Sequence, residues 1–356
     1  MTPKRIVHCA NFNTIRLKGC YMASMGYKLT QGLIRLNHQV LCYSDRDIAK
    51  AFGFLGHKNF LGNRKANENF YKYCINLKPD VIILGHADTI SIETLKKIKE
   101  ELKDVKIIQW NVDPVNPIEP SCINNIKNIK SKLEVVDYTF ITTADSRLLS
   151  VLDLEKNKVF FIPNPVDASI ETAKVYENPN PKYDLFFAAS PNSKRDLEGK
   201  LITSKELTEI ITNNVKSNKL LFPRLNSPSL DGISYLEGLA NSAMVLNISR
   251  LSSDYLYSSD RMAHAMGQGC LTFVDRKTGF GDIFTEDEIA FYETKDELID
   301  KINYYIENPK QRQIVAQNGY KKYHELFNET KVAKYLMSVI DGSFNEKDYP
   351  YKTLIK

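Results

Sequence analysis

The chain has 356 residues, 43% of them hydrophobic, and its 48 basic and 43 acidic residues give a formal net charge of +5. This length is too great for one small core and suits two α/β domains. Because lysine is interspersed with glutamate and aspartate, the composition argues against a nucleic-acid binder. An acidic small molecule or an anionic membrane surface would still suit the weak basic bias.

Cysteine usage and the hydrophobic runs bear on the cellular compartment. The six cysteines lie far apart with no C-x-x-C pair, which argues against a zinc ribbon and favours a reducing compartment. The N-terminus lacks the apolar run of a secretory signal. The longest aliphatic run, residues 81–85, is far shorter than a membrane span of about 20 residues. We expect a cytoplasmic protein, and contact with the inner face of the cytoplasmic membrane stays open.

Residues 1–170 alternate short apolar segments with amphipathic ones. Residues 19–38, for example, carry apolar side chains at helical spacing. Strand, helix, strand at this spacing is typical of a parallel, doubly wound sheet. We therefore predict a Rossmann-like N-terminal domain over residues 1–170. Its predicted strands are residues 5–12, 39–45, 80–88, 105–114, 137–144 and 158–167.

A polar, proline-containing stretch at residues 168–184 is the best linker candidate, and the alternation then restarts. We predict a second Rossmann-like domain over residues 171–335, and a C-terminal helix and tail, residues 336–356, that pack back toward the first domain. Two such domains would leave a cleft between the carboxyl edges of their sheets. The predicted strands are residues 183–190, 219–225, 243–250 and 270–276, and the predicted helices are residues 204–215, 234–242, 258–269, a pair over 295–327 split near 308–309, and 330–342.

The segment SSDRMAHAMGQGC, residues 258–270, follows the strand at residues 243–250. A helix in this place begins at the carboxyl edge of the sheet, and its unpaired first-turn amides attract an anion. Arg261 in the first turn is unfavourable for the helix dipole unless an anionic ligand lies there. The segment therefore predicts a diphosphate held by Arg261 and the amides near Ser258 and Ser259. The alternative is that Ser259 or Asp260 simply caps the helix while Arg261 is solvated.

Residues 234–328 resemble the donor-binding domain of GT-B glycosyltransferases of the retaining group 1 family, and within it the CgeB-like, spore-maturation branch. The resemblance implies the α/β fold class GT-B, with two Rossmann-like, doubly wound parallel-sheet domains facing a central cleft. It also implies a nucleotide-sugar donor on the C-terminal domain. The matching positions are Leu246, Asn247, Arg261, Ala265, Met266, Gly269 and the acidic tail over residues 296–323.

One position departs from the family pattern. The family has a glutamate where this chain has His264, and that glutamate is understood to hold the ribose hydroxyls of the nucleotide. A neutral imidazole can accept one hydroxyl bond but cannot chelate two. His264 lies about one turn beyond Asp260 and Arg261, so we expect it to face the donor, with a structural role as the alternative.

Further donor contacts are expected near the ends of other strands in the C-terminal domain. The resemblance points to Lys194 and Arg195 for the donor phosphates, and Arg224 lies just after a strand, where the nucleotide base often sits in similar proteins. Each of these three side chains could equally be solvated. The full set of expected donor-binding residues is Lys194, Arg195, Arg224, Asn247, Ser258, Ser259, Asp260 and His264.

The N-terminal domain offers candidates for catalysis and for the acceptor. Asp113 precedes Pro114, which holds it extended, and it could orient an acceptor hydroxyl or act as general base. His86 also follows a predicted strand and has a weaker case for the same role. Aspartate before proline is also a common turn residue. For the acceptor we expect the polar loop after the first strand, namely Asn11, Asn13, Lys18 and Gly19.

The leading hypothesis is therefore a glycosyltransferase without a metal or a cofactor. Arg261 would stabilise the departing diphosphate, and Asp113 and His86 would complete the catalytic set. The partners would be a nucleotide-sugar donor and a glycan or lipid-linked acceptor, as in surface-polysaccharide or lipopolysaccharide biosynthesis of a bacterial cell, and no nucleic acid. By resemblance the sugar carbon keeps its configuration. The alternatives are a non-catalytic nucleotide- or sugar-binding module and a nucleotide-sugar epimerase on the same fold.

Overall fold

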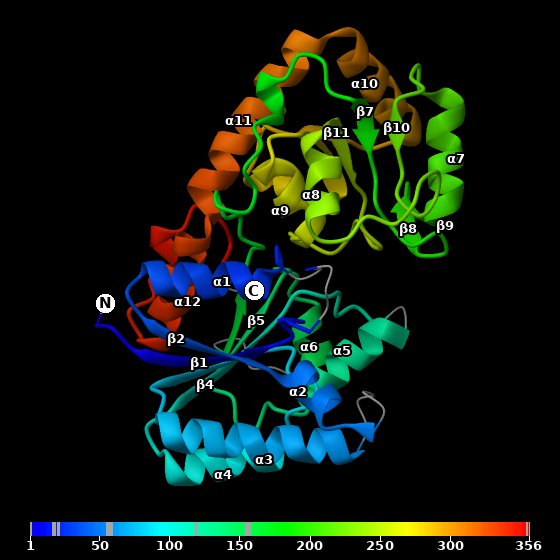
Figure 1. Cartoon of the computed structure of the whole chain (residues 1–356). Helices are drawn as coiled ribbons and strands as arrows, with labels where there is room; N and C mark the ends of the chain where they lie inside the picture. Colours follow the sequence, from blue (N-terminus) through cyan, green and yellow to red (C-terminus); the bar gives the residue numbers. More distant parts are fainter. Residues whose placement is uncertain are drawn as a thin grey trace. The chain divides into compact units, whose positions relative to one another are not determined.

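The computed structural model of the chain describes residues 2–15, 19, 22–54, 60–117, 120–153, 158–353 and 355. The chain divides into two compact units (Figure 1). Unit 1 comprises Met1–Pro163 and Glu329–Lys356, and unit 2 comprises Asn164–Asn328. The boundaries predicted from the sequence, after residues 170 and 335, differ from these. One physical reason is that the backbone N–H of Asn164 donates to Ser258 Oγ and that of Val166 donates to the Phe327 carbonyl, both inside unit 2.

Unit 1 contains a parallel sheet, six-stranded over the described residues, in the order β2-β1-β3-β4-β5-β6. Strand β1 pairs with β2 on one side and β3 on the other, so the chain changes direction across the sheet at β1. Such a switch point is where open α/β sheets bind ligands, beyond the carboxyl ends of the strands. The strands are β1 (Arg5–Ala10), β2 (Gln39–Ser44), β3 (Val81–Gly85), β4 (Lys106–Asn111), β5 (Tyr138–Ile141) and β6 (Val159–Phe161).

Helices cover this sheet, and its inner strands are correspondingly apolar. All five residues of β3, the run VIILG, are buried, as expected for a parallel strand with both faces covered. The C-terminal helix packs closely on α1, since a Cβ added at Gly32 would lie 2.1 Å from the Glu329 carbonyl oxygen. The helices of unit 1 are α1 (Met25–Arg35), α2 (Asp45–Ala51), α3 (Phe60–Leu77), α4 (Ile92–Glu101), α5 (Pro120–Lys130), α6 (Leu148–Leu152) and α12 (Glu329–Ile340).

Unit 2 repeats the design with a second parallel sheet, in the order β10-β7-β11-β12-β13 within the described part of the chain. Here β7 pairs with β10 on one side and β11 on the other, which makes the β7–β11 junction the switch point. These two sheets confirm the predicted α/β class with two doubly wound parallel sheets. The strands are β7 (Tyr183–Phe186), β10 (Leu220–Leu221), β11 (Ser242–Asn247), β12 (Leu271–Asp275) and β13 (Ala290–Tyr292).

The helices of unit 2 begin and end at recognisable sequence signals. Thr203 and Glu206 form a capping box on α7, and Pro309 starts α11 directly after α10, as the sequence predicts. The helices are α7 (Ser204–Asn214), α8 (Ile233–Ala240), α9 (Asp260–Gly267), α10 (Lys295–Glu307) and α11 (Pro309–Phe327). None of the described helices in either unit is long and apolar enough to cross a lipid bilayer.

Two elements of unit 2 were not expected, namely β13 at the edge of the sheet and a hairpin. An antiparallel hairpin of β8 (Lys194–Leu197) and β9 (Lys200–Thr203) follows β7. Its sequence, KRDLEGKLIT, is dominated by charged residues and lacks the apolar run of a sheet strand. The turn depends on Gly199, whose φ of +79° suits glycine. Lys194 and Arg195, expected in a loop, therefore lie on a strand.

Candidate functional site

The carboxyl edge of the unit 2 sheet holds Arg261 at its switch point. Helix α9 begins at Asp260, thirteen residues beyond the last residue of β11, and Arg261 is its second residue. One guanidinium nitrogen, Nη2, donates to the Ala188 carbonyl at 3.2 Å, and Nη1 donates to the Ile248 carbonyl at 3.3 Å. Because Ala188 follows β7 and Ile248 follows β11, the side chain bridges the two strands where the sheet order reverses.

The guanidinium of Arg261 has a weakly compensated charge. Burial lowers its pKa, yet arginine remains protonated at neutral pH. Its partners within the described residues are the two carbonyl oxygens and the ring of Phe187, whose centroid lies 5.2 Å from Cζ. A partly buried cation with no carboxylate partner among the described residues is unfavourable unless an anion completes the site. The position is thus suited to a phosphate, which arginine binds with paired hydrogen bonds.

Other arginines gather around the end of β7. The Arg195 guanidinium lies 5.9 Å from the centroid of the same Phe187 ring. Arg224 reaches the loop after β7, where its Nη1 donates to Ser190 Oγ at 3.4 Å. The charge of Arg250 contributes to lowering the pKa of Arg261, so it is also close. Of the two hairpin residues that were expected to contact the donor phosphates, Arg195 is buried in this group, whereas Lys194 is exposed.

The hydroxyls at the start of α9 are already engaged. Ser259 caps the helix, since its Oγ accepts from the Met262 amide at 3.3 Å and donates to Asn247 Oδ1 at 2.8 Å. Ser258 Oγ accepts from the Asn164 amide at 2.9 Å. The backbone amides of Asp260 and Arg261, by contrast, have no acceptor in the described part of the chain. The predicted anion contact at this helix therefore falls to those amides and to Arg261, and Asn247 and Ser259 support the helix start.

His264 contacts a carboxylate that the sequence did not single out. Its Nδ1 lies 2.7 Å from Glu171 Oε1, and both side chains are buried. The ring also meets Tyr235 edge to face, with centroids 5.7 Å apart. A Cβ added at Gly267 would lie 2.8 Å from Glu171 Cγ, so glycine makes room for the glutamate. Glu171 is 93 residues away in the chain, and no local motif marks it.

At the carboxyl edge of the unit 1 sheet, His86 and Asp113 form a second pair. His86 follows β3 and Asp113 follows β4, and His86 Nε2 lies 3.7 Å from Asp113 Oδ2. Burial lowers the pKa of His86, and the Asp113 charge acts in the opposite direction. The side chain of Asp113 is half exposed, whereas that of His86 is largely buried. An imidazole kept neutral next to a carboxylate can accept or relay a proton near neutral pH.

The backbone at His86 is strained. His86 and Ala87 have φ values of +59° and +41°, which are uncommon for residues with a side chain. Asn128 Nδ2 donates to the His86 carbonyl at 2.7 Å and holds the turn. The Trp110 ring packs closely against the preceding Gly85, where an added Cβ would lie 2.1 Å from the ring. Strain of this kind persists where the surroundings impose it, and it often marks functional sites.

The residues expected to bind the acceptor lie after β1. Asn11 is half-buried, and Asn13 is buried with a φ of +52°. Gly19 also has a positive φ, +57°, which agrees with a turn that favours glycine. Lys18 lies outside the described residues.

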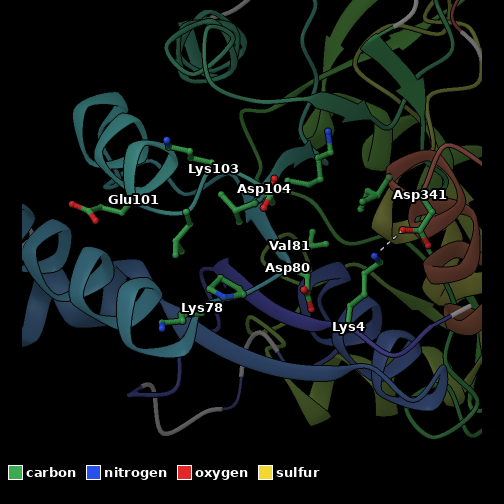
Figure 2. Close-up of a pocket in the computed structure, with 13 residues that line it drawn as sticks. Lys4, Lys78, Asp80, Val81, Glu101, Lys103, Asp104 and Asp341 are labelled. Carbon is green, nitrogen blue, oxygen red and sulfur yellow. Dashed lines mark ion pairs between the residues drawn. The ribbon is translucent and has the colours of Figure 1, made fainter.

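A cavity of about 590 Å³ lies elsewhere in unit 1. It is at the amino edge of the sheet, next to the starts of β1, β3 and β4, and Figure 2 shows that lysines and acids alternate around it. Lys4 pairs with Asp341 at 3.2 Å, and Lys78 and Lys103 follow the last residues of α3 and α4. Cations at helix carboxyl ends stabilise the helix dipoles. This cavity therefore has a structural explanation.

Candidate metal ligands do not cluster in the parts of the chain that the structure describes, where no three His, Cys, Asp or Glu side chains are placed to hold an ion.

Comparison with known proteins gives the fold a name. Residues 216–338 match the model of a family described as glycosyl transferase-like, and no curated protein matches the chain in sequence. Among solved structures, an α-glucosyltransferase in complex with UDP-glucose and DNA containing an abasic site superposes with a TM-score of 0.61 at 12% identity, covering 96% of this chain and 100% of that one.

Two further solved structures agree. Anabaena HepE, in complex with UDP and glucose, has a TM-score of 0.60 at 11% identity, covering 95% of this chain and 100% of its own. Sucrose-phosphate synthase from Thermosynechococcus elongatus has a TM-score of 0.59 at 11% identity, with 95% and 98% covered. The narrower resemblance to the CgeB-like branch stays a prediction. The chain has the GT-B fold, and its residues 216–338 are similar to the glycosyl transferase-like family.

Proposed function

We propose that this protein is a glycosyltransferase that moves a sugar from a nucleotide-sugar donor to a hydroxyl of a glycan or glycolipid acceptor, without a metal ion and with retention at the sugar carbon. The observation that carries the proposal is the half-buried Arg261, whose guanidinium is held by two carbonyls at the switch point of unit 2. The match of residues 216–338 to the glycosyl transferase-like family includes this helix.

In this proposal the donor binds unit 2 through its diphosphate. Arg261, Arg195 and Arg224 supply positive charge, and the first amides of α9 add two donors. During transfer, the bond between the sugar carbon and the diphosphate oxygen breaks and its electron pair stays on the nucleoside diphosphate. Because the arginines face charge that grows in the transition state, they stabilise that state more than the bound donor.

The acceptor binds unit 1 in the same proposal. Its hydroxyl oxygen forms the new bond to the sugar carbon, and the proton leaves that oxygen. His86 and Asp113 can orient the hydroxyl and take up the proton, because burial keeps the imidazole neutral.

The test is nucleotide release. The purified protein is incubated with UDP-, GDP-, ADP- and CMP-sugars, and the free nucleotide and the fate of the sugar are followed. We expect slow release from one nucleotide class through transfer to water. Tight binding with no release on any acceptor would contradict an enzyme and favour a binding module. Conversion of the donor into an epimer would favour an epimerase, whose fold is also similar at a TM-score of 0.52.

A further inference from the structure

A second cavity of unit 1, about 370 Å³, lies at the carboxyl ends of β1 and β2. It borders the segment after β1 and the first residues after β2, so it lies at the same sheet edge as His86 and Asp113. Edges of this kind bind ligands in open parallel sheets. Among the described residues, none that we expect to bind donor or acceptor lines it. The residues that line the cavity include Phe12, Tyr27, Cys42, Ser44, Asp47 and Ile48.

Most of the lining is apolar. Phe12 and Tyr27 meet edge to face, with ring centroids 5.2 Å apart, and Ile48 and the last residue of α2, Ala51, continue the apolar wall. Aromatic rings of this kind pack against the C–H face of a ring-shaped ligand. A highly charged ligand would find few partners here.

Asp47 is the charged residue among those that line the cavity, and only one of its two carboxylate oxygens accepts hydrogen bonds from the described residues. Oδ2 accepts from the Thr14 amide at 2.7 Å, from Thr14 Oγ1 at 3.0 Å and from Ser44 Oγ at 2.6 Å. Oδ1 is buried and has no hydrogen-bond donor among the described residues. A buried carboxylate oxygen without a donor is unfavourable, because its hydrogen bonds to water have been lost and not replaced. A ligand that brings one hydroxyl to this oxygen would remove that penalty.

These features favour one ligand chemistry. A neutral sugar ring has an apolar C–H face and hydroxyl donors on the same small body. An alkyl chain would satisfy the aromatic wall but leave Asp47 without a donor, and a phosphate would be repelled by the carboxylate. We propose that this cavity binds a neutral sugar ring, with a hydroxyl donating to Asp47 Oδ1 and the ring face against Phe12 and Tyr27. Identifying that sugar as part of the acceptor rests on the proposed function.

Cys42 provides a direct readout. It lines the cavity and is exposed, whereas Cys9, Cys74, Cys122 and Cys270 are buried. Cys20 lies outside the described residues, so the experiment uses a Cys20→Ser background. Alkylation of Cys42 by N-ethylmaleimide is timed with and without a panel of neutral methyl hexosides. At least one hexoside should slow alkylation by about threefold or more at saturation. No slowing by any hexoside, or stronger slowing by 1-octanol than by every hexoside, would overturn the proposal.

Two variants locate the binding. Ala51→Trp places a bulky ring at the cavity wall without removing a hydrogen bond, so saturation-transfer NMR signals of the methyl hexoside should disappear. Ala168→Trp, at an exposed alanine of unit 2, should leave them unchanged. Asp47→Asn should weaken hexoside binding about tenfold, and unchanged affinity would overturn the Asp47 contact. Persistent signals in Ala51→Trp would overturn the cavity assignment.

Failure here is distinguishable from failure of the proposed function. Donor binding and nucleotide release are measured on the same protein without a hexoside. Release of nucleotide with no protection of Cys42 would reject the cavity and keep the enzyme. Protection without nucleotide binding would keep the sugar site and reject the transferase.

Discussion

The side chains gathered at the carboxyl end of β7 in unit 2 differ in charge from those at the ends of β2 and β3 in unit 1. Around the end of β7 in unit 2, the side chains of Arg195, Arg224 and Arg261 gather. Around the ends of β2 and β3 in unit 1 lie the carboxylates of Asp45 and Asp88, and Arg46 pairs with the latter at 2.7 Å. Both edges have the same parallel backbone and the same kind of switch point.

The difference shows that the fold supplies the place and the side chains supply the chemistry. An arginine edge attracts phosphate. At the carboxylate edge, burial raises the pKa of Asp45, and the charge of Asp88 adds to the effect. Groups with shifted pKa values suit hydroxyl binding and proton transfer. A nucleotide sugar and a hydroxyl acceptor need these two environments, so substitutions at the two edges should affect donor binding and acceptor transfer separately.

The largest effect is expected for Arg261→Ala. Loss of a group that stabilises charge in the transition state should slow nucleotide release by roughly 10²–10³-fold. Affinity for the nucleoside diphosphate, measured by calorimetry, should fall at least about tenfold. Lys216→Ala, which removes an exposed cation paired with Glu307, is the matched control and should change neither. Unchanged diphosphate affinity in Arg261→Ala would refute the arginine edge as the donor site.

Substitution of His86 by asparagine should act on the other edge. Transfer to an acceptor should fall by roughly 10²-fold, while donor affinity stays unchanged. Since burial lowers the pKa of His86, the neutral imidazole persists below its usual value of about 6.5. The acid limb of the wild-type pH–rate profile should therefore lie below pH 6.5 and change in the variant. Equal loss of donor affinity would contradict the division of roles.

A buried imidazole beneath the unit 1 edge should make stability depend on pH. His8 Nε2 accepts from Trp110 Nε1 at 3.1 Å, and burial lowers the pKa of His8 to about 3. Below about pH 6.5 the unfolded chain binds a proton that the folded chain does not. The free energy of unfolding therefore decreases as the pH is lowered, by up to about 1.4 kcal/mol per pH unit. Urea unfolding should show a shallower acid slope for His8→Gln, with parallel curves above pH 7.

The smallest effect is expected for Arg224→Ala. This arginine is exposed, and within the described part of the chain it bonds two serine hydroxyls, at 3.2 and 3.4 Å, so solvent screens its charge. We expect donor affinity to weaken about threefold, a change of about 0.7 kcal/mol. The difference in affinity between the variant and the wild type should become smaller at high salt. A loss as large as that of Arg261→Ala would mean that the phosphates lie nearer the β10 side.

The comparison also shows where sequence reasoning succeeds. The alternation of apolar runs and amphipathic helices predicted both parallel sheets, because burial on both faces demands continuous apolar strands. It located α9 and the break before Pro309, and of the two cap candidates, Ser259 and Asp260, the structure has Ser259 as the cap. The β8–β9 hairpin was not predicted, because its many charged residues do not show the apolar alternation typical of a strand. The residues of α2 were not assigned to a helix.

The sequence by itself determined the fold class and the helix that bears Arg261, since periodicity and capping are local properties. Only the tertiary structure decided which groups meet. It brought Glu171 to His264 across 93 residues, gave Arg261 two carbonyls that follow different strands, and left Asp47 Oδ1 without a donor among the described residues. These contacts depend on packing between distant segments, and no spacing along the chain encodes the distance between side chains that far apart.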